Sequence, residues 1–594
     1  MDKSTSRLLL ENLLDRVVVD PETGQGTLAG VLTPKEIEAL KMASTLLTES
    51  GINDSQSKVK LEPLVDQLND DGNAVSGLDS TPKGKAAEDV VTDSEVETEL
   101  KLDLEQKTEL NLTSLNFATP QDPETRMCLD FGTAMSKAFA SIIENDEIVN
   151  YMSLQLGRRA SSNGTRSIYP VPSSLWISNE GKIYLGEKAI ILSLQEPSKN
   201  RERFDSLKKE LILGMKESSP FNQQMRESLN PTKVPLSTGS VITLYLGYLT
   251  DLACTELEEV YKCSRYVLRN FALPSWAPER REWGETLLKN MLIKAQIVAD
   301  TFHGKWDDGL SITDVKSVLE KVDKLDAIPD YLVSKGITEP LAVGSSRLRQ
   351  EEKFRGLAMV VDVGAGTSDL ALFVVVENPE RNLFNAFPVL GCNQSLHMAG
   401  DTLDTALRKM ILDKSGISKD DSEYTYINQH LRLQVRTLKE NLFRDGYCIV
   451  NLENGARIRI EQDEYLCQDS VLRFEQSLFD KLDEILKSIK IGLSQTCGRG
   501  GLSVVLTGGG ATLPMVKKLT RGNFNAHGIQ ILKYEVPLVP EAFERDQEIA
   551  DVYPQLAVAI GGTMPVLIDE KDALDDLEIP QGQFILNRTA MTGI

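Results

Sequence analysis

The sequence lacks any long hydrophobic run. No stretch of about twenty consecutive apolar residues occurs, so no segment is expected to span a membrane. The apolar patch within residues 1–20 is short and interrupted by Glu11 and Asp15, which argues against a signal peptide. Neither a membrane-spanning segment nor a signal peptide is therefore expected from these residues.

Cysteine and histidine are sparse, and basic residues are outnumbered by acidic ones. The seven cysteines are scattered without a CxxC pair, which argues against a zinc knuckle and a disulfide framework and fits a reducing cytoplasm. The four histidines lie far apart, so each is expected on the surface or in the core rather than on a metal. With 65 basic against 88 acidic residues, the net charge of −23 argues against a nucleic-acid footprint and against docking on anionic lipid.

At 594 residues the chain exceeds what one hydrophobic core usually serves, so at least two domains are expected. Residues 1–49 predict an N-terminal helical extension, because residues 33–36, Thr-Pro-Lys-Glu, match a capping box with proline at the first helical position. We interpret the extension as an appended helical element. The alternative is a docking peptide for a protein partner.

Residues 50–122 have few aromatic residues and many acidic, small and polar ones, as in NDDGNAVSGLDSTPKGKAAEDVVTDSEVETEL. Such a segment cannot bury enough apolar surface to order itself, so it predicts a disordered acidic linker. From Met127 to about residue 570, apolar strands, glycine-rich turns and helical patterns alternate, which is typical of an α/β domain. We place this domain at residues 123–570, and residues 571–594 form a C-terminal tail.

Two turns in this domain combine an acid, glycine and threonine between apolar strands. The first is LDFGTAMSK, with Asp130, and the second is VDVGAGTSD, with Asp362. Glycines let backbone N–H groups approach phosphate oxygens, threonine adds a hydroxyl donor, and an aspartate holds the waters around Mg²⁺. Two such β-hairpins facing each other would clamp a triphosphate. A third element, LTGGGATLP, predicts a buried strand, a bare glycine loop that fits a base or sugar, and a helix beginning near Pro514.

These motifs, in this order, resemble those of the actin-like ATPase superfamily, and most of all the nucleotide-binding domain of DnaK-type heat-shock chaperones. LDFGTAMSK and VDVGAGTSD resemble the two phosphate loops, ITEPLAVG and YPQLAVAIGG the two connecting motifs, and LTGGGATLP the adenosine motif. The resemblance covers about residues 126–570. It implies an α/β fold of two duplicated, ribonuclease H-like lobes with a nucleotide cleft between them: lobe I at about 126–361 and 553–570, and lobe II at about 362–552.

The resemblance also assigns roles to single residues. Asp130 and Asp362 would hold hydrated Mg²⁺, and Asp369 a monovalent cation such as K⁺. Lys208, with Lys209 as the fallback, would point at the γ-phosphate, and Glu339 would orient or deprotonate the attacking water. The catalytic set is therefore Lys208, Glu339, Asp362 and Thr367. The remaining ATP/ADP-binding positions are Gly132, Thr133, Gly364, Ala365, Gly366 and Thr367 around the phosphates and Lys439, Gly508, Gly509 and Gly510 around the nucleoside.

Three positions depart from the chaperone pattern. Ala134 replaces a hydroxyl residue, Ala365 the middle glycine of the second loop, and Thr512 the arginine that stacks on adenine. Phosphate and metal binding are expected to persist, with adenine held differently. Only some 30 residues follow the second connecting motif, so the chaperones' peptide-binding domain is expected to be absent.

The sequence therefore predicts a slow ATPase that acts as a chaperone-like or regulatory switch on a protein partner, through residues 1–122 or the lobe surfaces. One alternative is a filament-forming scaffold like the bacterial actins and FtsA, to which the triple glycine is similar. A second is an ATP sensor without hydrolysis. A third, a sugar or acetate kinase, needs a second substrate pocket, for which the sequence identifies no residues.

Overall fold

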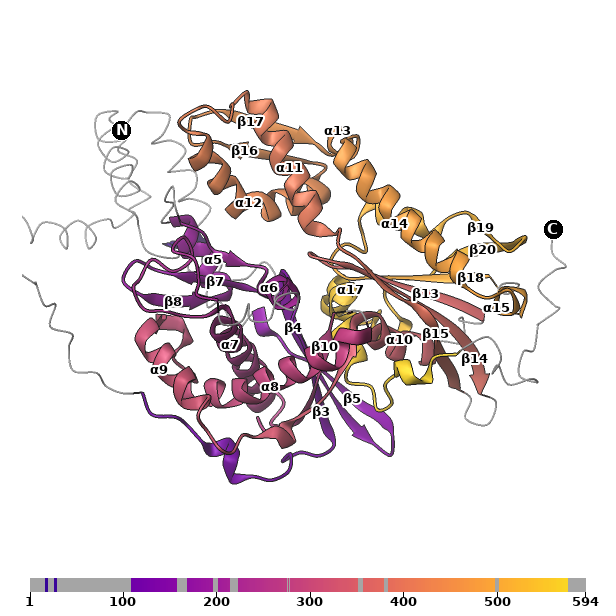
Figure 1. Cartoon of the computed structure of the whole chain (residues 1–594), viewed down its shortest axis with the longest axis horizontal. Helices are drawn as coiled ribbons and strands as arrows, with labels where there is room; N and C mark the ends of the chain where they lie inside the picture. Colours follow the sequence, from indigo (N-terminus) through magenta and orange to yellow (C-terminus); the bar gives the residue numbers. More distant parts are fainter. Residues whose placement is uncertain are drawn as a thin grey trace, which may run out of the picture. The chain divides into compact units, whose positions relative to one another are not determined.

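The computed structural model describes residues 17–19, 26–28, 108–157, 168–195, 201–213, 223–274, 276, 278–350, 356–378, 383–496 and 501–574 (Figure 1). The chain forms two compact units, Met1–Glu105 and Gln106–Ile594. In the first unit, strands β1 (Val17–Val19) and β2 (Gly26–Leu28) pair antiparallel, a hairpin that the predicted helical extension did not include. The capped helix predicted from residue 33 lies outside the described residues, as do the linker up to residue 107 and most of the tail.

The predicted linker extends too far toward the second unit. Residues 108–122 belong to that unit, where the 3₁₀ helix η1 (Thr113–Asn116) buries Ser114 completely. The ring of Phe117 packs on Tyr266 with 5.2 Å between ring centroids. The predicted boundary at residue 122 is therefore wrong, because this short segment carries enough apolar surface to pack against the core.

The second unit contains two six-stranded mixed sheets. In the first, the strands follow the order β12–β10–β3–β4–β5, with β6 (Val171–Pro172) also paired to β4. Strands β12, β10 and β3 run parallel, whereas β3, β4 and β5 form antiparallel hairpins. The strand bounds are β3 (Thr125–Asp130), β4 (Met135–Glu144), β5 (Glu147–Ser153), β10 (Leu268–Leu273) and β12 (Val333–Thr338).

The second sheet repeats this arrangement. Its order is β15–β14–β13–β18–β20–β19, in which β13, β18 and β20 run parallel and β13, β14 and β15 pair antiparallel. Five strands of each sheet therefore share one order and one set of directions, and each predicted turn connects the equivalent hairpin. The bounds are β13 (Gly356–Val363), β14 (Ser368–Asn378), β15 (Leu383–Leu396), β18 (Leu502–Thr507), β19 (Asn523–Ala526) and β20 (Ile529–Glu535).

Helices and smaller sheets complete the unit. The helices are α5 (Gly186–Gln195), α6 (Leu207–Leu213), α7 (Thr238–Glu259), α8 (Pro278–Phe302), α9 (Ile312–Val322), α10 (Glu339–Gln350), α11 (Gly400–Ser415), α12 (Tyr424–Asp445), α13 (Gln462–Leu466), α14 (Asp469–Ser488), α15 (Ile491–Thr496), α16 (Pro514–Lys517) and α17 (Gln547–Gly561). The small sheets are β11–β8–β7–β9, from β7 (Ser174–Ile177), β8 (Lys182–Leu185), β9 (Phe204–Asp205) and β11 (Leu310–Ser311), and β16–β17, from Tyr447–Asn451 and Arg457–Glu461. Within the described residues, no helix is both apolar and long enough to cross a bilayer.

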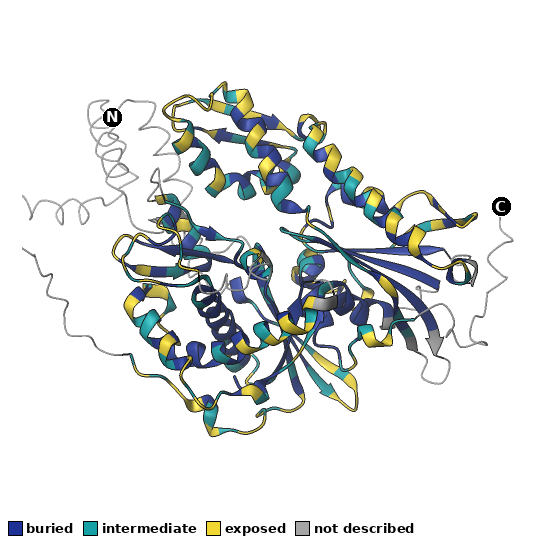
Figure 2. Ribbon diagram, in the orientation of Figure 1, coloured by how far each residue is buried: buried dark blue, intermediate teal, exposed yellow. Residues whose placement is uncertain are grey.

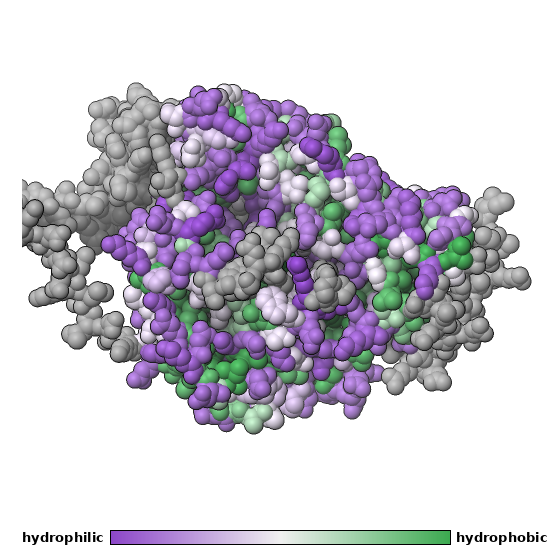
Figure 3. Space-filling view, in the orientation of Figure 1, coloured by the Kyte–Doolittle hydropathy of each residue, from purple (hydrophilic) through white to green (hydrophobic). Residues whose placement is uncertain are grey.

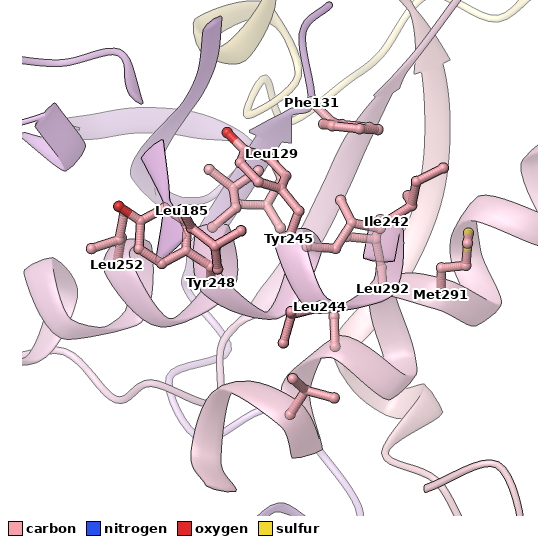
Figure 4. Close-up of a cluster of buried hydrophobic side chains, with 14 of the residues drawn as sticks. Leu129, Phe131, Leu185, Ile242, Leu244, Tyr245, Tyr248, Leu252, Met291 and Leu292 are labelled. Atoms are coloured by element: carbon pink, nitrogen blue, oxygen red, sulfur yellow. The ribbon is translucent and has the colours of Figure 1, made fainter. Parts of the chain in front are cut away.

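Helix α7 anchors the first sheet. Its N-cap Ser237 accepts a hydrogen bond from the N–H of Ser240, and most of the helix is buried (Figure 2). Figure 4 shows Tyr245 and Ile242 of α7 among the side chains that pack with Leu129 and Phe131 of the first hairpin. Since side chains alternate along a strand, packing Leu129 and Phe131 into this core turns Asp130, between them, to the opposite face.

Strand β13 is buried on both faces, as its unbroken apolar sequence predicts. Met359 and Val361 join the cluster that contains residues of α11, α12 and α14, whereas Ala358 and Val360 join the cluster with residues of α10 and α17. Asp362 continues the row of Ala358 and Val360 at the end of the strand. The core on both sides of β13 thus fixes the direction in which this carboxylate points.

Arg265, next to α7, provides a test of the core. Its guanidinium pairs with Asp251 (2.7 Å) and Asp300 (3.0 Å), and both carboxylates are buried. Burial raises the pKa of Asp300 to about 6, although Arg265 opposes the shift. Replacing Arg265 by Met leaves both acids without this cation, so the free energy of unfolding is expected to fall by about 3–5 kcal/mol.

Urea denaturation measures this loss. The control is Arg444→Met, which removes an exposed arginine paired with Asp445 and is expected to change stability little. An Arg265→Met protein as stable as the control would contradict the assignment of this network as a stabilising feature of the core.

Candidate functional site

The tips of the two predicted hairpins meet. Gly132 and Thr133 lie in the turn between β3 and β4, and Gly366 lies in the turn between β13 and β14. A Cβ atom built on Gly366 would lie 3.0 Å from Oγ1 and 3.1 Å from Cγ2 of Thr133. The structure thus brings together two turns that are more than two hundred residues apart in the sequence.

Local contacts explain the glycines in these turns. A Cβ on Gly132 would collide with the carbonyl oxygen of Met135, so the first turn accepts no side chain there. In the second turn, the N–H of Gly364 donates to the carbonyl of Thr367 at 3.0 Å. Ala365 is not among the described residues with positive φ, so alanine can adopt the backbone conformation of this turn, where the chaperone pattern has glycine.

The start of α11 holds the second turn from behind. The N–H of Gly400 donates to the carbonyl of Gly364 (3.2 Å), and the N–H of Asp401 donates to that of Ala365 (2.8 Å). Two of the first N–H groups of the helix, which have no partner inside it, are satisfied in this way. Movement of α11 would therefore be transmitted directly to the turn.

The triple-glycine loop lies against the second acid. Gly508 has φ +82°, its N–H donates to the carbonyl of Pro554 (2.7 Å), and a Cβ there would collide with Oδ1 of Asp362. The N–H of Gly510 donates to the carbonyl of Val363 at 2.9 Å. A Cβ on Gly509 would meet nothing within 4 Å, so bare backbone is exposed at the middle glycine. Helix α16 begins at Pro514, where the sequence predicted a helix.

Lys208 and Glu339, both members of the predicted catalytic set, form an ion pair through Nζ and Oε1. Lys208 lies near the start of α6 and is 3% exposed, and Glu339 is the first residue of α10, directly after β12. The neighbouring Lys209 is exposed. Glu339 also contributes to raising the pKa of Asp362, so the ion pair and the second turn form one electrostatic cluster.

Lys137 belongs to this cluster and was missed by the sequence interpretation. Its Nζ lies 3.1 Å from Oδ2 of Asp130. The two residues are direct partners across the β3–β4 hairpin. The sequence alone could have predicted this contact. Counting residues outward from the turn along both strands of the hairpin pairs Asp130 with the only lysine of LDFGTAMSK, and residues paired in this way lie side by side.

The cluster holds more acids than cations. Burial raises the pKa of Glu339 to about 7, opposed by Lys208 and reinforced by Asp369 and Asp130. Burial, together with Glu339 and Asp369, raises the pKa of Asp362 well above its usual range. Four carboxylates, those of Asp130, Glu339, Asp362 and Asp369, thus share two ammonium groups, those of Lys137 and Lys208. Such a site gains stability from an additional cation.

The geometry limits how a cation can bind. Across the part of the chain that the structure describes, no group of three or more His, Cys, Asp or Glu side chains is arranged to hold a metal ion directly. Mg²⁺ keeps several waters and takes one or two carboxylates, so Asp130 and Asp362 fit such an ion through its water shell. Asp369 instead accepts a hydrogen bond from Oγ1 of Thr367 (2.7 Å).

Lys439 is less available than the resemblance implies. Its Nζ lies 2.8 Å from Oδ1 of Asp404 and donates to the carbonyl of Gly400 at 3.0 Å. A Cβ on Gly400 would lie 3.3 Å from the carbonyl oxygen of Gly364. Lys439 therefore supports the junction between α11 and the second phosphate turn, in addition to any contact with a nucleoside.

A pocket of about 660 Å³ opens beside the second turn. Of the predicted site residues, Gly366 and the fallback Lys209 line it; the rest of its wall comes from His397, the outer face of α11 and the segment that begins α14. The pocket therefore adjoins the carboxylate cluster and is distinct from the glycine loop.

No protein-family model matches this chain, and no curated protein matches it either. The functional argument therefore depends on the geometry of the two turns and of the carboxylate cluster between them.

Proposed function

We propose that residues 123–570 bind ATP and Mg²⁺ between the two hairpin turns and hydrolyse ATP slowly. The observation that carries this proposal is the contact between Gly366 and Thr133, which joins the two glycine-containing turns where four acids outnumber two lysines. A phosphate chain supplies acceptors for the turn N–H groups, and its bound metal supplies the missing positive charge.

The strand order supports membership of the actin-like ATPase superfamily. Five strands in each sheet follow the same order and directions, β12–β10–β3–β4–β5 and β20–β18–β13–β14–β15, which fits two duplicated lobes. The two turns occupy equivalent hairpins, so each lobe contributes one phosphate-binding turn. This correspondence is at the level of fold, and the function still rests on the site.

Each residue of the site has a defined task in this scheme. When bound, Mg²⁺ would neutralise phosphate charge, held through waters by Asp130 and Asp362. The N–H of Gly366 and the hydroxyl of Thr133 would bind phosphate oxygens. Gly364 and Thr367 would shape the turn, because the Gly364 N–H donates to the Thr367 carbonyl and the Thr367 hydroxyl donates to Asp369. Lys137 and Lys208 balance the remaining negative charge, and Asp369 fits a monovalent cation such as K⁺. The open backbone at Gly509 would border the nucleoside.

Glu339 is the residue suited to accept a proton from the attacking water. A general base works best when its pKa lies near the working pH, and burial raises the pKa of Glu339 to about 7. The paired Lys208 keeps part of the carboxylate ionised by opposing this shift. Together the two residues orient and deprotonate water at the end of the phosphate chain.

Contacts between β9, its flanking residues and α12 provide a means of switching. The guanidinium of Arg203 donates to the carbonyl of Leu433 (3.3 Å), and Arg432 lies 3.7 Å from Glu202. These contacts cross from the first lobe to the second, so a change at the phosphates would alter the angle between the lobes. We propose that a protein partner reads this angle, through residues 1–122 or the lobe surfaces.

Isothermal titration calorimetry of the full chain tests the nucleotide site. ATP is expected to bind in the presence of Mg²⁺ and to bind far more weakly with EDTA. Asp362→Asn should lose the dependence on Mg²⁺, whereas the control Asp420→Asn, an exposed residue in the loop between α11 and α12, should behave as wild type. Binding of ATP that is indifferent to Mg²⁺ and to Asp362 would contradict the proposal.

Proton release gives an independent readout. Burial raises the pKa of Glu339 to about 7, so this carboxylate is partly protonated near pH 7, and burial raises the pKa of Asp362 as well. A cation favours the ionised form and lowers both pKa values, so binding of Mg²⁺ with ATP releases protons. Titration at pH 7 in two buffers of different ionisation enthalpy should detect roughly one proton per ATP, fewer at pH 8.5. Uptake of protons would contradict this electrostatic account.

A further inference from the structure

The pocket beside the second turn carries cationic groups that the nucleotide site does not use. Lys209, Lys409 of α11 and Arg473 of α14 line it, and none of these three side chains forms an ion pair with a described residue. Two acids, Asp401 and Asp469, share the wall. Asp401 is already opposed by Arg436, whose Nη2 lies 3.6 Å from its Oδ1.

This balance of charge is opposite to that of the whole chain. The protein has a net charge of −23, yet the pocket lining carries three cations against two acids, Asp401 and Asp469. A concave site with an excess of one sign of charge raises the local concentration of oppositely charged ligands. Hydrophilic residues cover most of the upper part of the molecule as seen in Figure 3. An apolar ligand or a cation would find few complementary groups there.

The size of the pocket indicates what kind of anion fits. Its volume of about 660 Å³ lies within the range of small-molecule sites. That volume exceeds what a single phosphate ion fills, and the separated cations on α11, α14 and α6 favour a molecule with more than one charged group. The chemistry shared by such ligands is a small organic anion with two or more phosphate or carboxylate groups.

The pocket is also mechanically connected to the phosphate turn. Gly366 and Asp401 both line the pocket. The N–H of Asp401 also donates a hydrogen bond to the carbonyl of Ala365 in the second turn. A ligand that contacts α11 and Lys209 at once would bridge the two lobes on either side of Gly366. Its binding would therefore favour one arrangement of the turn.

The geometry points to a second ligand site in this pocket, for a small organic polyanion held by Lys209, Lys409 and Arg473, whose occupancy alters ATP binding through the Gly366 turn. The claim that an anion binds depends on the pocket alone. The claim that its binding alters ATP binding rests on the proposed function. Neither half requires the anion to react.

Calorimetry with the full chain tests the site, with citrate and fructose 1,6-bisphosphate as probes and inorganic phosphate as the single-group comparison. Citrate or fructose 1,6-bisphosphate is expected to bind one per chain and more tightly than phosphate. Lys409→Gln and Arg473→Gln should each weaken binding about tenfold, since each removes a charged hydrogen-bond donor. The control Lys419→Gln removes an exposed lysine in the loop after α11 and should change nothing.

Repeating the ATP titration with the anion present separates the two proposals. A change of threefold or more in the Kd of ATP, lost in Lys409→Gln, supports the coupling. Anion binding that depends on Lys409, with no ATP binding at all, would support the pocket and overturn the nucleotide site. Three results would overturn the second site. The first is ATP binding without any anion binding, and the second is anion binding that neither variant changes. The third is a Lys409→Gln protein that loses ATP binding as much as it loses anion binding.

Discussion

Replacing Glu339 by Gln is expected to lower ATP turnover by about 10²–10⁴-fold while Mg²⁺-dependent ATP binding persists. Glutamine keeps the size and the hydrogen-bonding oxygen of the side chain but cannot accept the proton of the attacking water. The buried Lys208 retains a polar neighbour, so the site should remain folded. Single-turnover hydrolysis and calorimetry, measured on the same protein, separate the loss of chemistry from any loss of binding.

Glu320→Gln is the matched control for this experiment. Glu320 lies on the exposed side of α9, where its only described ion pair is with Lys316 at 3.8 Å, so its replacement should leave turnover unchanged. Wild-type turnover in Glu339→Gln would exclude the proposed base. Absence of turnover in the wild type, with ATP still bound, would instead favour a nucleotide sensor without hydrolysis.

Replacing Lys208 by Gln is expected to have two separable effects. Turnover should fall by about 10²–10³-fold, because a fixed positive charge near the transferring phosphate is lost. In addition, Lys208 lowers the pKa of Glu339 against the effect of burial, so removing it should raise that pKa above about 7. A base with a higher pKa is ionised only at higher pH, and the rising limb of the pH–rate profile should therefore move to more alkaline pH.

The pH–rate profile distinguishes this electrostatic role from a purely structural one. A destabilised protein would lose activity without a shift of the profile, and Lys233→Gln, at an exposed lysine outside the site, should alter neither rate nor profile. A Lys208→Gln profile that moves toward acid would contradict the pairing of Lys208 with Glu339 as the feature that tunes the base.

The sequence predicted those parts of the site that depend on local structure. The hairpins around Asp130 and Asp362 and the loop at Gly508 follow from strand, turn and glycine patterns that span a few residues each. Lys208 and Glu339 came from the resemblance, and their ion pair is consistent with it. Lys137 could also have been predicted from the sequence, because the register of a hairpin is itself a local property.

Other features depend on packing between distant segments. The pocket combines Lys209 with residues of α11 and α14, and no local pattern indicates which of their exposed cations converge. The attachment of residues 108–122 depends on an aromatic contact between Phe117 and Tyr266, which are far apart in the chain. The duplication of the two sheets was expected only from the resemblance, since a shared fold needs similar packing rather than a repeated sequence.

A crystal structure of the chain with Mg²⁺ and a non-hydrolysable ATP analogue tests the central claim most directly. The account predicts one magnesium ion with its water shell contacting both Asp130 and Asp362, with the terminal phosphates between Thr133 and Gly366. An analogue bound away from the two hairpin turns, or a metal ion that contacts neither carboxylate through its waters, would contradict it.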